Sequence, residues 1–264
     1  MAGRTGLEPA ASCVTGRRYN QLNYRPTLRA TPELIEEGNV GSGGLSILMG
    51  QFKTPSTFEG SAPTGELPLP ERSLSGRSYG DRREPGLMLT YKMGVLKGQA
   101  MLSNGQGTNV NDTNDSKDLH LRLDFTPNPA IGAGAFVTLG DFAFDNKGRV
   151  GANLKYVPSE ALMLRAEVVQ ARDGTTNSTG WMMDAASQLS DALQPVVRFD
   201  GISIDGSFTG YAATVGVNYN LLKHHSRATL AYANLTNMVG GGGSYALSNN
   251  SGGHLIWVTL QASI

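Results

Sequence analysis

Six basic residues occupy polar positions in segments where apolar and polar residues alternate along the chain. They are Lys53, Lys92, Arg122, Lys155, Arg165 and Arg198. Arginine can hold a phosphate group through two parallel hydrogen bonds, and rings of Arg or Lys lower the electrostatic barrier to an anion. If these residues share one aqueous wall, the chemistry that they support is the attraction and passage of anions.

Acidic neighbours offer a second interpretation of these cations. Asp124, Glu167 and Asp200 each stand two residues after one of the three arginines. Ion pairs between solvated side chains contribute little, so the cations could pair with these carboxylates and merely hydrate the wall. The sequence leaves both interpretations open.

Patterns typical of catalysis or metal binding are weak. The four histidines and the single cysteine, Cys13, give no nucleophile and base at a recognisable spacing, so we predict no enzyme active site and no cofactor. His224 and His225 are adjacent and would face opposite ways on a strand, which disfavours a metal site. The run 111–115 lacks the glycine and glutamate of a calcium loop, and no Lys-Ser or Lys-Thr follows the glycines at 240–243.

Composition excludes two classes of protein. The 22 Lys plus Arg balance 22 Asp plus Glu, unlike the basic excess of a nucleic-acid-binding protein. No apolar run approaches the roughly 20 residues of a membrane-spanning helix. Membrane-spanning strands stay open, because their alternating pattern looks hydrophilic on average.

From about residue 45 onward the dominant feature is a period of two. Between Asp118 and Phe125, leucines at 119, 121 and 123 alternate with His120, Arg122 and Asp124. A strand places these two sets on opposite faces, whereas a helix would scatter them. Such alternation predicts about twelve strands, at 45–53, 86–93, 96–104, 118–125, 131–139, 150–156, 162–168, 180–189, 194–200, 213–221, 226–235 and 256–262.

The connections between these strands alternate in length. Short turns are predicted at 93–95, 126–129, 157–160, 190–192 and 222–225, and long polar loops at 54–85, 105–117, 172–179, 201–208 and 236–253. Short turns at one rim and long loops at the other are typical of antiparallel transmembrane β-barrels in the bacterial outer membrane. We expect the short turns to be periplasmic and the long loops extracellular.

Aromatic residues near the strand ends support the same fold. Tyr91, Phe125, Tyr156 and Tyr219 share the apolar face near the short-turn rim, as expected for an interfacial girdle. Trp257 lies on the polar face instead, which indicates a local bulge. Ordinary core packing in a soluble β-sandwich is the alternative for the girdle.

Eight segments follow an order and spacing similar to a known family. They are 50–55, 71–74, 83–89, 117–122, 164–168, 172–174, 193–200 and 215–219. Together they resemble the phosphate-selective porins O and P, and the resemblance covers nearly everything from about residue 45. It implies a sixteen-stranded barrel with a cleaved signal, of which this chain would supply an N-terminally truncated part. Ile264 departs from the aromatic residue that usually ends such barrels.

The predicted organisation is therefore an irregular or non-native segment at 1–44 and a partial outer-membrane barrel at 45–264. Porins often fold one loop inward, so loop 54–85 is the candidate constriction, with a surface loop as the alternative. Its candidate residues are Arg72, Arg77, Arg82 and Arg83.

The expected function is passive diffusion of small hydrophilic solutes, with anions such as phosphate favoured, across the bacterial outer membrane. Expected partners are the small anionic solutes, outer-membrane lipid and lipopolysaccharide, and further copies of the chain in a homotrimer; no nucleic acid is expected. The alternative is a plugged structural or adhesive barrel without transport, which bulky apolar residues on the inner face would favour; Phe136 is the main example. A soluble lipocalin-like barrel would require an apolar interior.

Overall fold

The computed structural model describes residues 36–40, 43–142, 145–205, 208–221, 226–236 and 253–262. They form one 13-stranded antiparallel sheet in which every strand pairs with its neighbours in chain order. The strands are β1 (Glu36–Val40), β2 (Gly43–Lys53), β3 (Arg83–Met93), β4 (Leu96–Ser103), β5 (Asp118–Asn128), β6 (Ile131–Phe142), β7 (Asp145–Ser159), β8 (Leu162–Asp173), β9 (Thr176–Ser187), β10 (Leu193–Ile204), β11 (Phe208–Asn220), β12 (Ser226–Thr236) and β13 (Gly253–Ala262). No helix in the described ranges is long and apolar enough to span a membrane.

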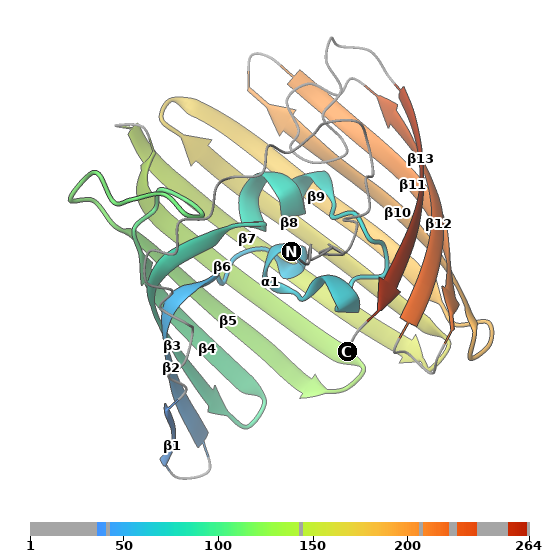
Figure 1. Ribbon diagram of the computed structural model, residues 1–264, viewed down its shortest axis with the longest axis horizontal. Helices are drawn as coiled ribbons and strands as arrows, with labels where there is room; N and C mark the ends of the chain where they lie inside the picture. The colour runs from blue at the N-terminus through green and yellow to red at the C-terminus, as the bar shows by residue number, and fades with distance from the viewer. Residues whose placement is uncertain are drawn as a thin grey trace, which may run out of the picture.

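The sheet curves around a hollow that contains short helical turns (Figure 1). These turns, α1 (Phe58–Ser61), η1 (Thr64–Glu66) and η2 (Gly76–Gly80), all belong to the connection between β2 and β3. Among the described residues, β1 pairs only with β2 and β13 only with β12. The described strands alone therefore leave the circle open.

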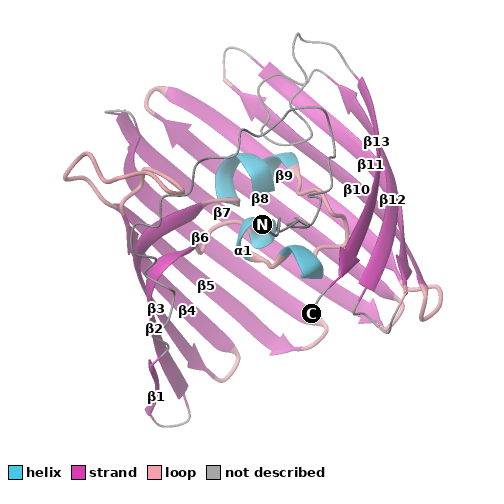
Figure 2. Ribbon diagram, in the orientation of Figure 1, coloured by secondary structure: helices cyan, strands magenta, loops and turns pink. Residues whose placement is uncertain are grey.

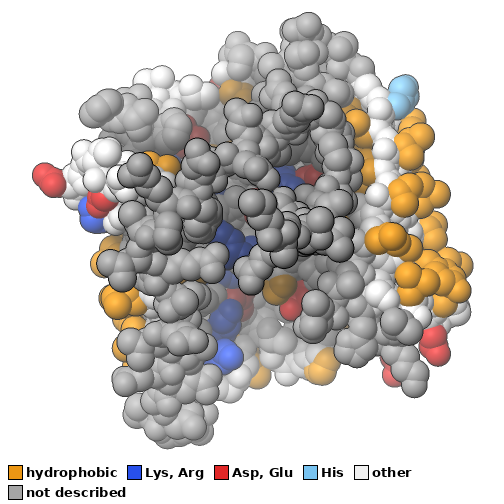
Figure 3. Space-filling model, viewed as in Figure 1, with side chains coloured by type: hydrophobic (Ala, Val, Ile, Leu, Met, Phe, Trp, Pro, Cys, Tyr) orange, Lys and Arg blue, Asp and Glu red, His pale blue; other side chains and the backbone are white. Residues whose placement is uncertain are grey.

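The two faces of the sheet have opposite chemistry, as the alternation predicted. On β5, Leu121, Leu123 and Phe125 are exposed while His120 and Arg122 are buried. The outer apolar surface continues around the sheet; members on other strands include Leu89, Val150, Leu154, Val168, Val197, Val215, Leu230, Ile256, Val258 and Leu260. In Figure 3, hydrophobic side chains gather on the outer sides of the molecule, and Lys and Arg side chains lie in the central hollow. The predicted all-β transmembrane barrel architecture is confirmed.

The aromatic girdle also lies outside, but Trp257 corrects the sequence interpretation. Tyr91, Phe125, Tyr156 and Tyr219 are all exposed on the outer face. Trp257 is buried, and the β12–β13 register runs without interruption through the pair Ala231↔Trp257. The predicted bulge is therefore wrong, because the indole simply faces inward.

Two predicted long loops are in fact short connections. The loop expected at 172–179 is a turn at 174–175, and the one expected at 201–208 is confined to 205–207. Strands extend through polar sequence there: Thr176 pairs with Asp173, and Ser178 with Ala171. Backbone pairing does not require apolar side chains once a strand leaves the hydrocarbon, so the period of two disappears before the strand ends. Most of the last predicted loop, 236–253, and all of the predicted turn at 222–225 lie outside the described residues.

The strand β1 lies inside the segment that the sequence assigned as irregular. Glu36–Val40 contains a single apolar residue, so no alternation is visible there. It nevertheless pairs with β2 in continuous register from Glu36↔Ile47 to Val40↔Gly43.

We predict that a charge on the outer face destabilises the barrel more than the same charge on the inner face at equal depth. Leu123 is 53% exposed at the middle of β5, and its partner Gly98 is followed by the inward Gln99. Leu123→Arg should lower the free energy of unfolding in lipid vesicles by about 2–4 kcal/mol, because the guanidinium would meet hydrocarbon.

Gln99→Arg is the control, since it places the same charge over the aqueous hollow. Urea titrations followed by tryptophan fluorescence measure both variants. Equal destabilisation by the two substitutions would contradict the assignment of faces.

Candidate functional site

Residues 54–82, which we call the inserted segment, lie within the curve of the sheet (Figure 2). Leu67, Leu69 and Leu74 are almost completely buried, as are the polar residues Glu59 and Ser73. The Thr57 side chain caps α1 by accepting a hydrogen bond from the Gly60 backbone N at 3.0 Å. The connection therefore folds inward and does not lie on the surface.

The wall behind this segment carries two rows of charge on neighbouring strands. In the first row, Arg165 of β8 lies opposite Asp184 of β9 in the strand register, and Asp184 lies opposite Arg198 of β10. In the second row, Glu167 and Asp200 stand on either side of Met182. All of these positions face inward and are buried.

Glu59 of α1 joins the inserted segment to the first row. Arg165 Nη2 donates to Glu59 Oε1 at 3.1 Å, and Arg198 Nη1 donates to the same oxygen at 3.3 Å. The Ser73 backbone N donates to Oε2 at 2.6 Å. Burial raises the pKa of the Glu59 carboxyl, but Arg198, Arg165 and the hydrogen bonds from Ser73 lower it by more, so the pKa lies below its ordinary 4.5. Glu59 is therefore a buried anion that bridges two wall cations.

The second row accepts hydrogen bonds from the segment's backbone. Phe58 N donates to Glu167 Oε1 at 2.6 Å, and Leu74 N donates to Asp200 Oδ2 at 2.7 Å. Further from this centre, Tyr79 Oη donates to Ser178 Oγ at 2.8 Å. Hydrogen bonds to a carboxylate, such as those accepted by Glu167 and Asp200, are stronger than neutral ones and fix the orientation of the segment.

Apolar contacts complete the attachment on the same side of the barrel. Leu69 and Leu74 form a buried cluster with Trp257 and with inward residues of β9–β13. A Cβ on Gly216 would lie 2.7 Å from Leu69 Cδ2, and one on Gly180 would lie 2.6 Å from the Tyr79 ring, so both wall glycines make room for the segment. The inner face is thus more apolar than the sequence suggested, because alanines, Met182, Val196 and Leu235 join Phe136.

The six predicted pore-lining cations all belong to the strands, but they have different surroundings. Arg165 and Arg198 are paired beneath the segment, and Arg122 donates to Ser56 O and to Asp124. Lys92 is exposed at the short-turn end of β3. Lys53 and Lys155 line a cavity that is described below.

The four candidate constriction arginines mainly support the segment's own fold. Arg72 Nε donates to Glu59 O at 2.8 Å, and its guanidinium lies 3.4 Å from Asp81. Arg77 pairs with Glu71 and Asp81. Arg82 is partly exposed at the end of the segment. Arg83 is exposed and belongs to β3, which corrects its placement in the loop.

A cavity of about 590 Å³ separates the inserted segment from the other half of the wall. Its inner-wall residues come from β2–β7. The charged residues that line it are Lys53, Glu66, Lys97, Arg122, Asp124 and Lys155. Lys53 Nζ donates to Ala62 O at 2.5 Å, and Arg122 pairs with Asp124. This arrangement leaves the cavity with an excess of positive charge.

Sequence reasoning missed Glu59 and a group formed by Glu84, Asp118 and His120. Glu59 lies in a connection without periodicity, so nothing marked it. Asp118 and His120 stand two residues apart on one strand and therefore on one face. This spacing in the sequence indicates that the two side chains lie close together.

Several solved structures share this fold. One is the outer-membrane channel DcaP of Acinetobacter baumannii, with 12% identity, 75% of this chain and 76% of that chain covered, and a TM-score of 0.56. Another is an anion-selective porin from Comamonas acidovorans, with 12% identity, 81% and 72% covered, and a TM-score of 0.58. A third is OmpT, an outer-membrane protein of Vibrio cholerae, with 10% identity, 82% and 80% covered, and a TM-score of 0.54.

No protein-family model and no curated protein matches the sequence. At these identities the structural likeness establishes the fold, which is the β-barrel of outer-membrane porins. Membership of the phosphate-selective O and P family stays a prediction.

We predict that Glu59→Gln loosens the inserted segment. Removing one partner of a buried ion pair costs about 3–5 kcal/mol, because Arg165 and Arg198 keep their charge without this counter-ion. Hydrogen–deuterium exchange of the amides in residues 54–82 should accelerate. Glu66→Gln, at an exposed position of the same segment, should leave exchange unchanged; equal protection in both variants would contradict the role of Glu59.

The contribution of Glu59 should also depend on pH in one direction. Because its pKa lies below 4.5, the stabilisation is complete above that value and is lost as the pH falls through the lowered pKa. The difference in amide protection between wild type and Glu59→Gln should therefore be larger at about pH 5 than in stronger acid. A difference that grows in acid would exclude an ionised Glu59.

Proposed function

From the porin-type barrel we propose that the protein is a bacterial outer-membrane channel for the passive diffusion of small hydrophilic solutes, with a preference for anions such as phosphate. The observation that carries the proposal is the lysine-lined cavity beside the inserted segment. The outer apolar belt fits a hydrocarbon environment, and the inner face fits water.

The solute path runs along one side of the lumen. The half of the wall formed by β8–β13 is covered by the inserted segment through Glu59 and the apolar cluster. The half formed by β2–β7 faces the cavity. A solute therefore passes between the segment and these strands.

Selectivity in this path depends on the lysines. Arg165 and Arg198 are occupied by carboxylates, whereas Lys97 and Lys155 face the cavity from β4 and β7. A lysine ammonium attracts an anion without the two-point grip of arginine, which suits conduction because no solute is held tightly.

Lipid, lipopolysaccharide and other copies of the chain are the partners that fit the outer surface. We propose that the exposed apolar belt contacts lipid acyl chains and, in a homotrimer, neighbouring barrels.

A plugged structural or adhesive barrel is the second candidate. It is favoured by the many buried residues of the inserted segment and by the inward apolar cluster around Leu74 and Trp257. A plugged barrel would insert into membranes without conducting.

Reconstitution in planar bilayers tests the proposal. Discrete conductance steps and a reversal potential of anion-selective sign under a salt gradient are expected, with inhibition of chloride current by phosphate. A charge about 8 Å from an ion in water changes its energy by about 0.5 kcal/mol. Lys97→Glu or Lys155→Glu should therefore lower anion permeability by about fivefold, since each reversal changes the charge by two.

Lys117→Glu is the matched control, because Lys117 is exposed in the connection 104–117 and pairs with Asp112. This variant should keep the wild-type selectivity. Cation preference in the wild type would overturn the anion assignment, and insertion without conductance would favour the plugged barrel.

A further inference from the structure

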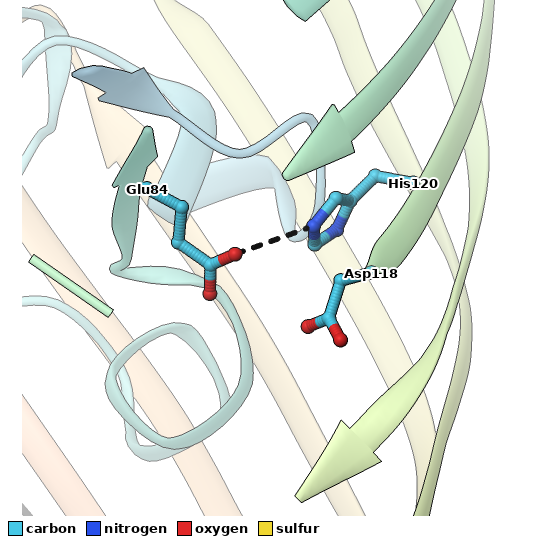
Figure 4. A group of neighbouring side chains, drawn as sticks. All are labelled: Glu84, Asp118 and His120. Carbon is cyan, nitrogen blue, oxygen red and sulfur yellow. Dashed lines mark ion pairs between the residues drawn. The ribbon is translucent and has the colours of Figure 1, made fainter. Parts of the chain in front are cut away.

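Three buried side chains meet on the inner wall at the long-loop end of β3 and β5 (Figure 4). Glu84 comes from β3, and Asp118 and His120 come from β5. One ligand atom from each lies within 4.8 Å of the others. Their residue exposures are 0%, 1% and 3%, so the group is shielded from bulk water.

Hydrogen bonds orient two of the three side chains. Ser103 Oγ donates to Glu84 Oε2 and lies 3.0 Å from His120 Nε2. Thr138 Oγ1 lies 3.0 Å from His120 Nδ1. Glu84 Oε1 is buried without a hydrogen-bond partner. A buried carboxylate oxygen without a partner is costly, and a bound cation would satisfy it.

The two carboxylates have two basic neighbours. Lys147 of β7 pairs with Asp118, and His120 Nε2 lies 3.8 Å from Glu84 Oε2 (Figure 4). With a neutral imidazole, two carboxylates therefore meet one ammonium. Gly140 pairs with Lys147 in the sheet register, and a Cβ on Gly140 would overlap Asp118 Oδ1. The absence of a side chain at Gly140 therefore makes room for the Asp118 carboxylate itself.

We propose that Glu84, Asp118 and His120 form a binding site for one divalent transition-metal ion of the zinc type. Two carboxylate oxygens and one imidazole nitrogen are a donor set that zinc and its neighbours accept, whereas calcium and magnesium prefer oxygen alone. Thr138 Oγ1 lies 3.0 Å from His120 Nδ1 and can accept from Nδ1–H, so Nε2 can coordinate a metal ion in place of its contact with Ser103 Oγ. When no metal ion is bound, the Lys147 ammonium supplies the positive charge next to Asp118. When the ion binds, this ammonium moves away from the carboxylate.

The connection 104–117 lies against this site. Gly105 N donates to Glu84 Oε2 at 3.2 Å, and Thr108 Oγ1 donates to Arg83 O at 2.8 Å. Most of this connection is otherwise exposed. A metal ion would join β3 to β5 two residues beyond the end of the inserted segment, and would so hold that end of the segment near the wall.

Calorimetric titration of the folded, detergent-solubilised full chain with Zn²⁺ tests the site. The background carries His224→Gln and His225→Gln, so that the adjacent pair cannot bind the ion. We expect saturable binding of one ion per chain. Loss of an outer-shell partner alone weakens metal sites by about 10–100-fold, so Glu84→Gln and His120→Gln should weaken binding by at least about 100-fold.

His254→Gln is the control, because His254 is exposed on β13 against Tyr232; it should bind as the background does. Lys147→Met gives an independent readout: removing the competing ammonium should tighten binding on the order of tenfold. Circular dichroism confirms that each variant is folded.

The proposal is overturned if no saturable Zn²⁺ binding occurs, if Glu84→Gln or His120→Gln binds as tightly as the background, or if Ca²⁺ displaces Zn²⁺ at equal concentration. If Glu84→Gln and His120→Gln fail to fold, the Zn²⁺ affinity of Lys147→Met decides whether the site exists. Unchanged or weaker Zn²⁺ binding by Lys147→Met contradicts the site.

Discussion

The interior of this barrel depends on one buried carboxylate held between two arginines on its wall. Glu59 accepts from Arg165 at 3.1 Å and from Arg198 at 3.3 Å. Desolvating three charges is costly unless each is fully partnered, so the geometry admits few alternatives. Asp184 pairs with Arg165, and Glu167 and Asp200 accept hydrogen bonds from backbone amides of the segment. The attachment decides which half of the wall the segment covers and which half borders the cavity.

Strand register makes this arrangement possible. Arg165, Asp184 and Arg198 come together because three strands pair without a shift at that level. A slip by one residue would turn all three toward the hydrocarbon and bring Leu164 or Val197 inside. The outer apolar belt and the inner ionic row are therefore two results of the same pairing, and selection against the wrong register acts on both faces at once.

The alternation predicted the fold well because almost every residue of a spanning strand meets either lipid or an aqueous interior. It failed where that contrast ends, as at Thr176 and Ser178, where strands continue in water. The interpretation of Trp257 failed for another reason: its apolar surroundings are created by Leu69 and Leu74, which are remote in sequence. Glu59 could not be predicted from its own neighbourhood, since its partners lie 106 and 139 residues away.

The turn at 174–175 has a consequence for recognition at the long-loop rim. β8 and β9 stay paired up to Asp173↔Thr176, at the rim that also carries the connection 104–117. A ligand that lands on this hairpin orders almost no additional backbone, whereas one that lands on a longer connection must immobilise it. Antibodies raised against the intact barrel should therefore concentrate on the stiff hairpin tip and recognise it poorly once the chain is denatured.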